Sequence, residues 1–90
     1  MEHHPYISMP DMTEITYSDT KMINGIKCVC IYYERPNTDR TDFDSFSFLF
    51  PQDRFDAVVG YTSKELENEH KRLIRMGELL LEWNEEKSDA

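Results

Sequence analysis

The chain has 90 residues, and its 18 acidic side chains against 10 basic ones give a formal net charge of −8 at pH 7. Such a polyanion repels nucleic-acid phosphates and anionic lipid alike, so we expect no direct binding to nucleic acid or membrane. No apolar run approaches the roughly 20 residues of a membrane span, and the start of the chain lacks a signal-peptide pattern, so we expect a cytoplasmic protein.

The length is that of one domain, and an aromatic share of 12% is typical of a folded chain. Residues 1–11 contain two prolines and no regular hydrophobic period. We therefore expect a flexible N-terminal arm over residues 1–11, a single α+β domain over residues 12–86 and a frayed acidic tail over residues 87–90.

Two predicted strands follow the arm. Residues 12–23 alternate apolar and polar side chains, as a half-buried strand does. The dipeptide Asn24-Gly25 is the strongest short-range signal for a hairpin turn. Residues 26–34 are rich in β-branched and aromatic side chains, and both of their faces are largely apolar. This second strand is therefore predicted to lie centrally in the sheet.

The second strand carries the two cysteines, Cys28 and Cys30. Their side chains are expected on one face of the strand, about 7 Å apart, which is too far for a disulfide within the chain. Two thiols are also too few for a zinc site, which normally has four ligands. We predict that both are small buried side chains with free thiols.

Residues 35–41 have the composition of a turn, and Pro36 is expected to end the strand before it. The third strand is predicted over residues 43–50. Residues 52–60 are compatible with either a short helical turn or a fourth strand.

Thr62 and Glu65 form a capping box, which predicts the start of a helix that runs to about residue 86. Apolar residues recur along one side of this helix at helical spacing. They are Leu66, Leu73, Gly77, Leu80 and Leu81. The predicted fold is α+β: an antiparallel sheet of three or four strands with one long C-terminal helix packed on one face.

The third strand places phenylalanine at every second position: Phe46, Phe48 and Phe50. A strand with aromatic rings on one face is similar to the base-stacking strand of RNA-recognition motifs. However, Asp44 stands where that motif has a basic residue, and residues 12–51 leave no room for the motif's additional helix. We predict instead that the three rings belong to the hydrophobic core.

Two groups of residues are candidates for binding a partner. The first is a set of acidic residues on either side of the third strand: Asp39, Asp42, Asp44, Asp53 and Asp56. The second is an apolar edge of the helix, formed by Met76, Leu79 and Trp83, which is either a contact surface or additional core. The acidic residues lack the spacing of a calcium loop, so no metal site and no cofactor are expected.

The sequence contains neither a nucleophile motif nor a glycine-rich phosphate loop, so we do not expect an enzyme. A small acidic domain can occupy a basic nucleic-acid channel by placing carboxylates where phosphates would lie, which is the strategy of DNA-mimic and anti-CRISPR proteins. The sequence therefore predicts a protein-binding module that inhibits a nucleic-acid-binding partner with a basic surface. The alternative is a homodimeric structural or regulatory protein that associates through the apolar helix edge.

Overall fold

The computed structural model describes residues 3–37 and 42–88. These residues form strands and one helix, and the helix comes last. In chain order they are β1 (His3–Ser8), β2 (Glu14–Ser18), β3 (Lys21–Ile23), β4 (Ile26–Pro36), β5 (Phe43–Phe50), β6 (Arg54–Val59) and α1 (Ser63–Ser88).

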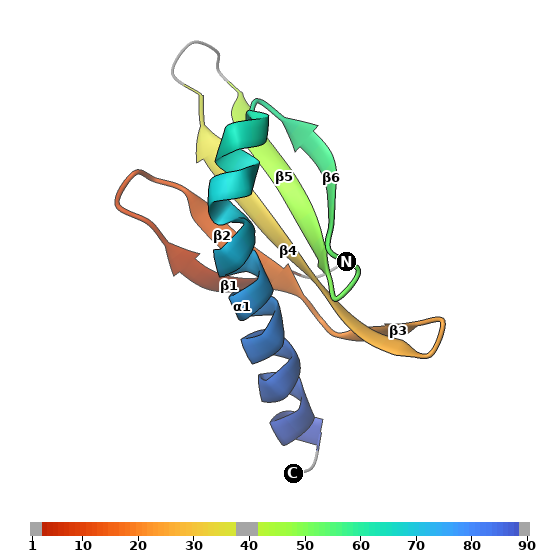
Figure 1. Ribbon diagram of the computed structural model, residues 1–90. Helices are drawn as coiled ribbons and strands as arrows, with labels where there is room; N and C mark the ends of the chain where they lie inside the picture. The colour runs from red at the N-terminus through yellow and green to blue at the C-terminus, as the bar shows by residue number, and fades with distance from the viewer. Residues whose placement is uncertain (1–2, 38–41, 89–90) are drawn as a thin grey trace.

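The described strands form one antiparallel sheet in the order β1-β2-β4-β5-β6, and the short β3 pairs with the N-terminal end of β4 (Figure 1). The predicted α+β fold is confirmed, but the sheet has five to six strands, more than the three or four expected. One additional strand, β1, lies within the segment predicted to be an arm. The other, β6, shows that residues 52–60 contain a strand and not a helical turn.

The segment predicted as the first strand is divided into β2 and β3. Ser18 is buried at this division, and its hydroxyl accepts a hydrogen bond from the Cys30 backbone N–H at 3.0 Å while donating to the Asp19 carbonyl. A side chain thus takes the place of a backbone partner, and the ladder is interrupted. Beyond the interruption, Asn24 and Gly25 have φ values of 51° and 80°, which confirms the predicted hairpin turn.

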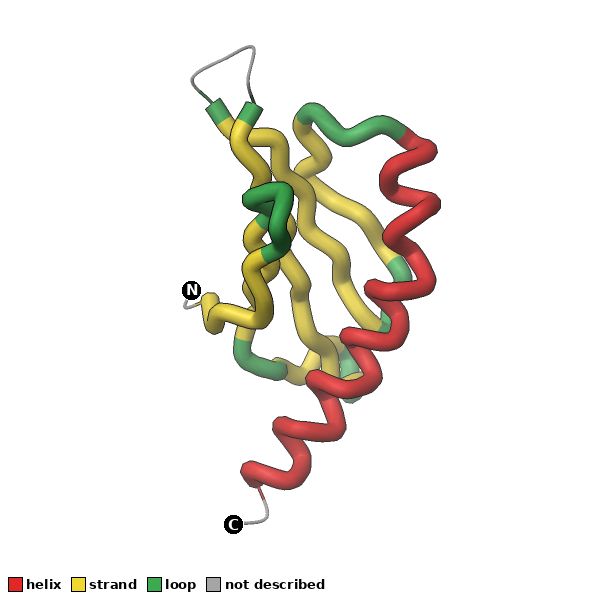
Figure 2. Tube along the Cα trace, turned by 90° about the vertical axis from the view of Figure 1, so that its left-hand side faces the viewer, coloured by secondary structure: helices red, strands yellow, loops and turns green. Residues whose placement is uncertain are grey.

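Helix α1 packs across β4 and β5 and covers one face of the sheet (Figure 1). The capping box is confirmed at its start, since the Glu65 N–H donates to Thr62 Oγ1 at 3.1 Å and the Thr62 N–H donates to Glu65 Oε1 at 2.9 Å. The opposite face of the sheet is not covered by a helix within the described residues (Figure 2). The helix continues to Ser88, into the range predicted as a tail.

The hydrophobic core lies between α1 and the sheet. Its sheet side includes Phe46 and Phe48, which are 2% and 0% exposed, so the prediction that the phenylalanine row is core is confirmed. Phe50 is partly buried against the same core. The buried apolar residues in contact with one another are Ile15, Val29, Ile31, Tyr33, Phe46, Phe48, Leu73, Met76 and Leu80.

A glycine sets how closely the helix approaches the sheet. Gly77 is buried in α1 directly above the ring of Phe50, and a methyl group at position 77 would overlap that ring. Glycine in the middle of a helix costs about 1 kcal/mol relative to alanine. The glycine is explained by the close contact between α1 and β5, because any larger residue at position 77 would push the helix away from the strand.

We expect the Gly77→Ala substitution to lower the free energy of unfolding by about 1–3 kcal/mol, because overpacking against Phe50 outweighs the gain in helix propensity. The measurement is the midpoint of urea unfolding. The control is Glu78→Ala, at the next position of the helix and exposed, where the substitution should be neutral or slightly stabilising. A Gly77→Ala protein as stable as this control would show that the helix is free to move away from β5.

Candidate binding surfaces

The structure does not gather the predicted acidic residues on one surface. Asp42 is exposed just before β5, whereas Asp53 lies beyond the other end of that strand, about 25 Å away at the usual rise per residue. Asp53 Oδ1 is hydrogen-bonded to His70 Nε2 at 2.6 Å. Asp56 is exposed on β6 and pairs with Arg54 at 3.4 Å. Asp39 lies outside the described residues.

Asp44 is buried, unlike the other described members of the predicted acidic set. It is 6% exposed, and its carboxylate accepts hydrogen bonds from Arg35 Nε at 3.1 Å and from the Asn37 side-chain amide at 2.9 Å. The reason is its position on β5, where it lies opposite Arg35 and on the side of the sheet that faces the helix. Asp44 therefore belongs to an internal ion pair and not to the exposed acidic surface.

Arg35 uses all three of its guanidinium nitrogens. Besides Asp44, it donates to both carboxylate oxygens of Glu65, at 2.6 and 3.2 Å, and to the Gly60 carbonyl at 3.2 Å. Its guanidinium carbon also lies 4.0 Å from the centre of the Tyr61 ring, in a cation–π contact. These contacts raise the pKa of Arg35 above its usual value, first through the hydrogen bond to Glu65.

The contacts between Arg35 and Glu65 also change the pKa of Glu65. The hydrogen bonds from Arg35 and from the Thr62 backbone lower the pKa of Glu65 from 4.5 to about 2. Arg35 thus fixes the first turn of α1 to β4 and β5 with a carboxylate that stays ionised far into the acid range. This network was missed by sequence reasoning, although Arg35 continues the alternation of Val29, Ile31 and Tyr33 toward the helix side.

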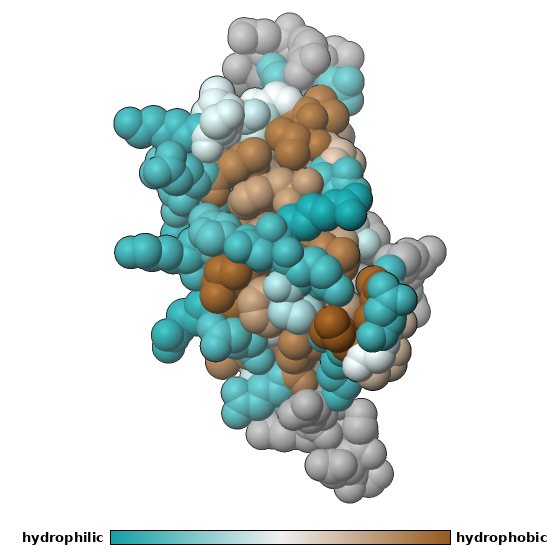
Figure 3. Space-filling view, turned by 45° about the vertical axis from the view of Figure 1, so that its right-hand side comes forward, coloured by the Kyte–Doolittle hydropathy of each residue, from teal (hydrophilic) through white to brown (hydrophobic). Residues whose placement is uncertain are grey.

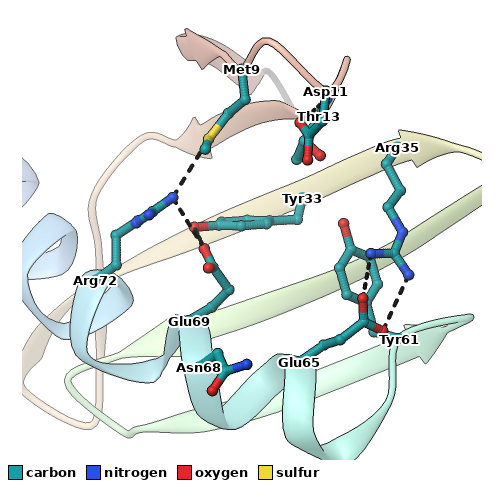
Figure 4. A pocket seen from close by; sticks show the side chains of 10 residues that line it. All are labelled: Met9, Asp11, Thr13, Tyr33, Arg35, Tyr61, Glu65, Asn68, Glu69 and Arg72. Atoms are coloured by element: carbon teal, nitrogen blue, oxygen red, sulfur yellow. Dashed lines mark hydrogen bonds and ion pairs between the residues drawn. The ribbon is translucent and has the colours of Figure 1, made fainter.

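A pocket of about 270 Å³ lies beside this network, between the first half of α1, the end of β4 and the turn that joins β1 to β2 (Figure 4). We call it the turn pocket. It is lined by Met9, Asp11, Thr13, Tyr33, Arg35, Tyr61, Glu65, Asn68, Glu69 and Arg72.

Side chains on the helix side of the turn pocket are paired with one another. The Tyr33 hydroxyl donates to Glu69 Oε1 at 2.9 Å, and Arg72 Nη1 lies 3.4 Å from the same oxygen (Figure 4). Burial, followed by the hydrogen bond to Glu69, raises the pKa of Tyr33, so its hydroxyl remains a neutral donor. The Tyr61 hydroxyl differs, because it is buried without a hydrogen-bond partner among the described residues.

The face of the sheet away from α1 forms a second surface, which we call the open face. Along β2, β4 and β5, its side chains alternate with the core residues, and those named below are half-buried or exposed. In cross-strand rows they are Glu14, Glu34 and Ser45, then Thr16, Tyr32 and Ser47, and then Cys30 and Leu49. Burial and the neighbouring Cys30 raise the pKa of Tyr32 to about 12, so it is neutral in this surface.

The open face carries two carboxylates directly opposite each other. Glu14 of β2 is the cross-strand neighbour of Glu34 of β4, and both side chains are exposed. Neither pairs with a cation among the residues that the structure describes. Like charges at such positions repel and are destabilising. This pair was not predicted from the sequence.

The apolar helix edge is divided between core and surface. Met76 is 4% exposed and belongs to the core, which agrees with the alternative reading of this edge as additional core. Leu79 is half-buried. Trp83 is 45% exposed, and its ring stacks on Tyr6 of β1 with centroids 6.2 Å apart.

Other exposed apolar side chains lie along β5 and β6. Phe43, Val58 and Val59 are 55%, 40% and 46% exposed. On the side of the molecule drawn in Figure 3, apolar side chains form patches that are separated by hydrophilic ones. The edge strand β6 is also irregular, with a register shift against β5 and a φ of 50° at Ala57. Such an irregularity disfavours pairing of an edge with another chain.

Cys28 is buried and Cys30 half-buried, and both thiols are free. The described residues contain no group of three or more histidine, cysteine or acidic side chains arranged to hold a metal ion. Within the same residues, α1 is not apolar enough over a sufficient length to cross a membrane. No protein family model, curated protein or solved structure matches the chain.

We expect Glu65 to contribute to stability in a pH-dependent way. Because its pKa is lower in the folded state, its contribution is complete above about pH 4.5 and is lost as the pH falls toward 2. In Glu65→Gln, the free energy of unfolding at pH 7 should fall by about 1 kcal/mol, since the pair is partly exposed and screened. Between pH 4.5 and 2 it should also fall less steeply than in the wild type.

The measurement is urea unfolding at a series of pH values. Glu67→Gln is the control, because Glu67 is exposed on the same turn of the helix. Equal pH slopes for the wild type and Glu65→Gln would mean that the contact with Arg35 does not hold Glu65 ionised in solution.

Proposed function

We propose that the chain is a non-enzymatic protein-binding module that blocks a basic, nucleic-acid-binding surface of a partner with the carboxylates of its open face. The observation that carries this proposal is the unpaired cross-strand couple of Glu14 and Glu34. Two carboxylates on rigid neighbouring strands keep a fixed separation, as the phosphates of a nucleic acid do. A basic partner would relieve their repulsion, which water alone only screens.

The other side chains of the open face support the same role. Tyr32 lies in the centre between Thr16 and Ser47, so the face presents one large ring flanked by small hydroxyl groups. Tyrosine is enriched at protein interfaces because it offers apolar area together with a hydrogen-bonding group. Small neighbours leave that ring accessible. The proposed contact therefore combines an apolar centre with an acidic end.

The charges of the remaining surface are mixed. On α1, exposed basic side chains alternate with exposed carboxylates: Lys64, Lys71, Arg72 and Arg75 against Glu67, Glu78 and Glu82. The open face, in contrast, has Arg54 at its β6 edge, where Asp56 pairs with it. A basic partner would therefore be attracted to the sheet side of the molecule in preference to the helix side.

Neutralising the couple should separate stability from binding. In Glu14→Gln/Glu34→Gln, we expect the free energy of unfolding to rise by about 0.5 kcal/mol through loss of repulsion. Capture of a basic protein from cell extract by the immobilised chain should nevertheless weaken, by about tenfold, as two charged contacts are lost. Wild-type capture should also fall as salt is raised, and duplex DNA should compete with it.

The control is Glu78→Gln/Glu82→Gln, which makes the same change in net charge on the exposed side of α1, where the two carboxylates are four residues apart. This variant should retain the captured protein. If both double variants capture the same amount of the basic protein, net charge alone determines capture, and the proposal is contradicted.

A homodimer is the second candidate function, and the exposure of Trp83 favours it. A large ring that is 45% exposed near the C-terminal end of a helix is suited to packing against a second copy. If this end of α1 is the seam, the wild type should sediment as a dimer and Leu79→Glu/Trp83→Ala as a folded monomer. Sedimentation of both proteins as monomers would exclude the seam.

A further inference from the structure

The charges around the turn pocket are unequal. It is lined by two guanidinium groups, of Arg35 and Arg72, and by three carboxylates, of Asp11, Glu65 and Glu69. Arg35 is already neutralised by Glu65 together with Asp44 from outside the pocket. Glu69 pairs with Arg72. The pocket therefore has an excess of negative charge, and the carboxylate left without a counter-ion is that of Asp11.

Asp11 is held in place by its own turn. Its Oδ1 accepts the Thr13 backbone N–H at 3.1 Å, and the turn is closed by hydrogen bonds between the backbones of Met9 and Thr13 and of Met12 and Met9. The hydrogen bond from the Thr13 backbone lowers the pKa of Asp11, so the carboxylate is ionised at neutral pH. Within the described residues, no cation lies within ion-pair distance of it.

The inner wall of the turn pocket adds an independent feature. The Tyr61 hydroxyl points from beneath Arg35 toward the space between Tyr33 and Thr13, and it has no hydrogen-bond partner among the described residues (Figure 4). A buried polar group without a partner is unfavourable, and such groups in native proteins call for an explanation. A phenolic oxygen can accept a hydrogen bond as well as donate one. Because the oxygen is buried, an incoming donor would satisfy it once the ring turns toward the pocket.

We propose that the turn pocket binds a primary alkylammonium group, supplied by a lysine side chain of the protein partner, with Asp11 as its counter-ion. The ammonium group has three donors, which match the Asp11 carboxylate, the second oxygen of Glu69 and the Tyr61 hydroxyl. The aliphatic stem of lysine would lie along the half-buried side chain of Met9. The volume of about 270 Å³ is sufficient for one such side chain.

An anionic ligand is disfavoured by the same geometry. Every nitrogen of the Arg35 guanidinium group already donates a hydrogen bond, and a carboxylate or phosphate in the turn pocket would lie beside Asp11, Glu65 and Glu69. The inference rests on the proposed function in one respect, which is that the ammonium group belongs to a basic protein partner.

The test is a titration of the ¹⁵N-labelled full chain with Nα-acetyl-lysine methylamide, followed by NMR. The expected result is a saturable shift of the backbone signals of Asp11, Thr13 and Asn68, which Nα-acetyl-norleucine methylamide does not reproduce. Asp11→Asn keeps an acceptor for the Thr13 N–H and so preserves the turn, but it should weaken binding of the lysine probe about tenfold. Glu67→Gln, which removes a nearby exposed charge outside the pocket, should leave binding unchanged.

Absence of these shifts, or equal binding by Asp11→Asn and Glu67→Gln, would overturn the inference. The source of the ammonium group is tested by a parallel titration with 1,5-diaminopentane. If this free diamine binds at the same residues more than tenfold tighter than the lysine probe, the ammonium group is not that of a partner protein, and this part of the inference is overturned. Neither titration involves Glu14 or Glu34, so failure here leaves the open-face proposal intact, and failure of open-face capture leaves the pocket result intact.

Discussion

The Arg35 guanidinium group joins parts of the chain that are far apart in sequence. It contacts Asp44 on β5, the Gly60 carbonyl after β6 and Glu65 in the first turn of α1. Without these contacts, the first half of the helix would be attached to the sheet by apolar packing and the hydrogen bond from Tyr33 to Glu69. Apolar packing fixes direction less strictly than hydrogen bonds of defined geometry. The turn pocket depends on this placement, because Glu65, Asn68 and the residues that follow form one of its walls.

Folding divides the acidic side chains into two functional groups. Asp44 and Glu65 are paired with Arg35, so they act within the protein and are not available to a partner. Glu14 and Glu34, in contrast, keep an uncompensated charge at the surface. A net charge of −8 therefore overstates the acidity of some surfaces and conceals its concentration on others. The surface that attracts a basic partner is therefore determined by where each carboxylate lies, and not by the total charge.

Local sequence patterns predicted the elements that they control. The asparagine–glycine turn, the phenylalanine row and the capping box at Thr62 each depend on residues close together in the chain, and each is found in the structure. β1 was missed because Pro5 within it and Pro10 just after it suggest an irregular segment. An edge strand tolerates proline, however, since one side of its backbone has no partner in the sheet. The additional strands thus arise where the sequence signal is weakest.

The pairing of Glu14 with Glu34 on the open face was not predictable, because the register between β2 and β4 differs from that of the hairpin. In the hairpin, Lys21 pairs with Cys28 and Ile23 with Ile26. Continued without interruption, this register would place Glu14 opposite Arg35, as a favourable ion pair. The break at Ser18 shifts the register by one residue, and Glu14 lies opposite Glu34 instead. A shift of this size changes which side chains face each other along the whole strand.

The same shift determines what each arginine and glutamate can do. Arg35 is directed toward the helix and takes Asp44 and Glu65, while Glu34 and Glu14 are left on the opposite face without a cation. The turn that carries Asp11 leads directly into Glu14, so the turn pocket and the acidic end of the open face are three residues apart in the chain. A partner that extends around this turn would contact both. One hydroxyl, that of Ser18, therefore connects the interruption of a strand to the position of the acidic surface that we propose for binding.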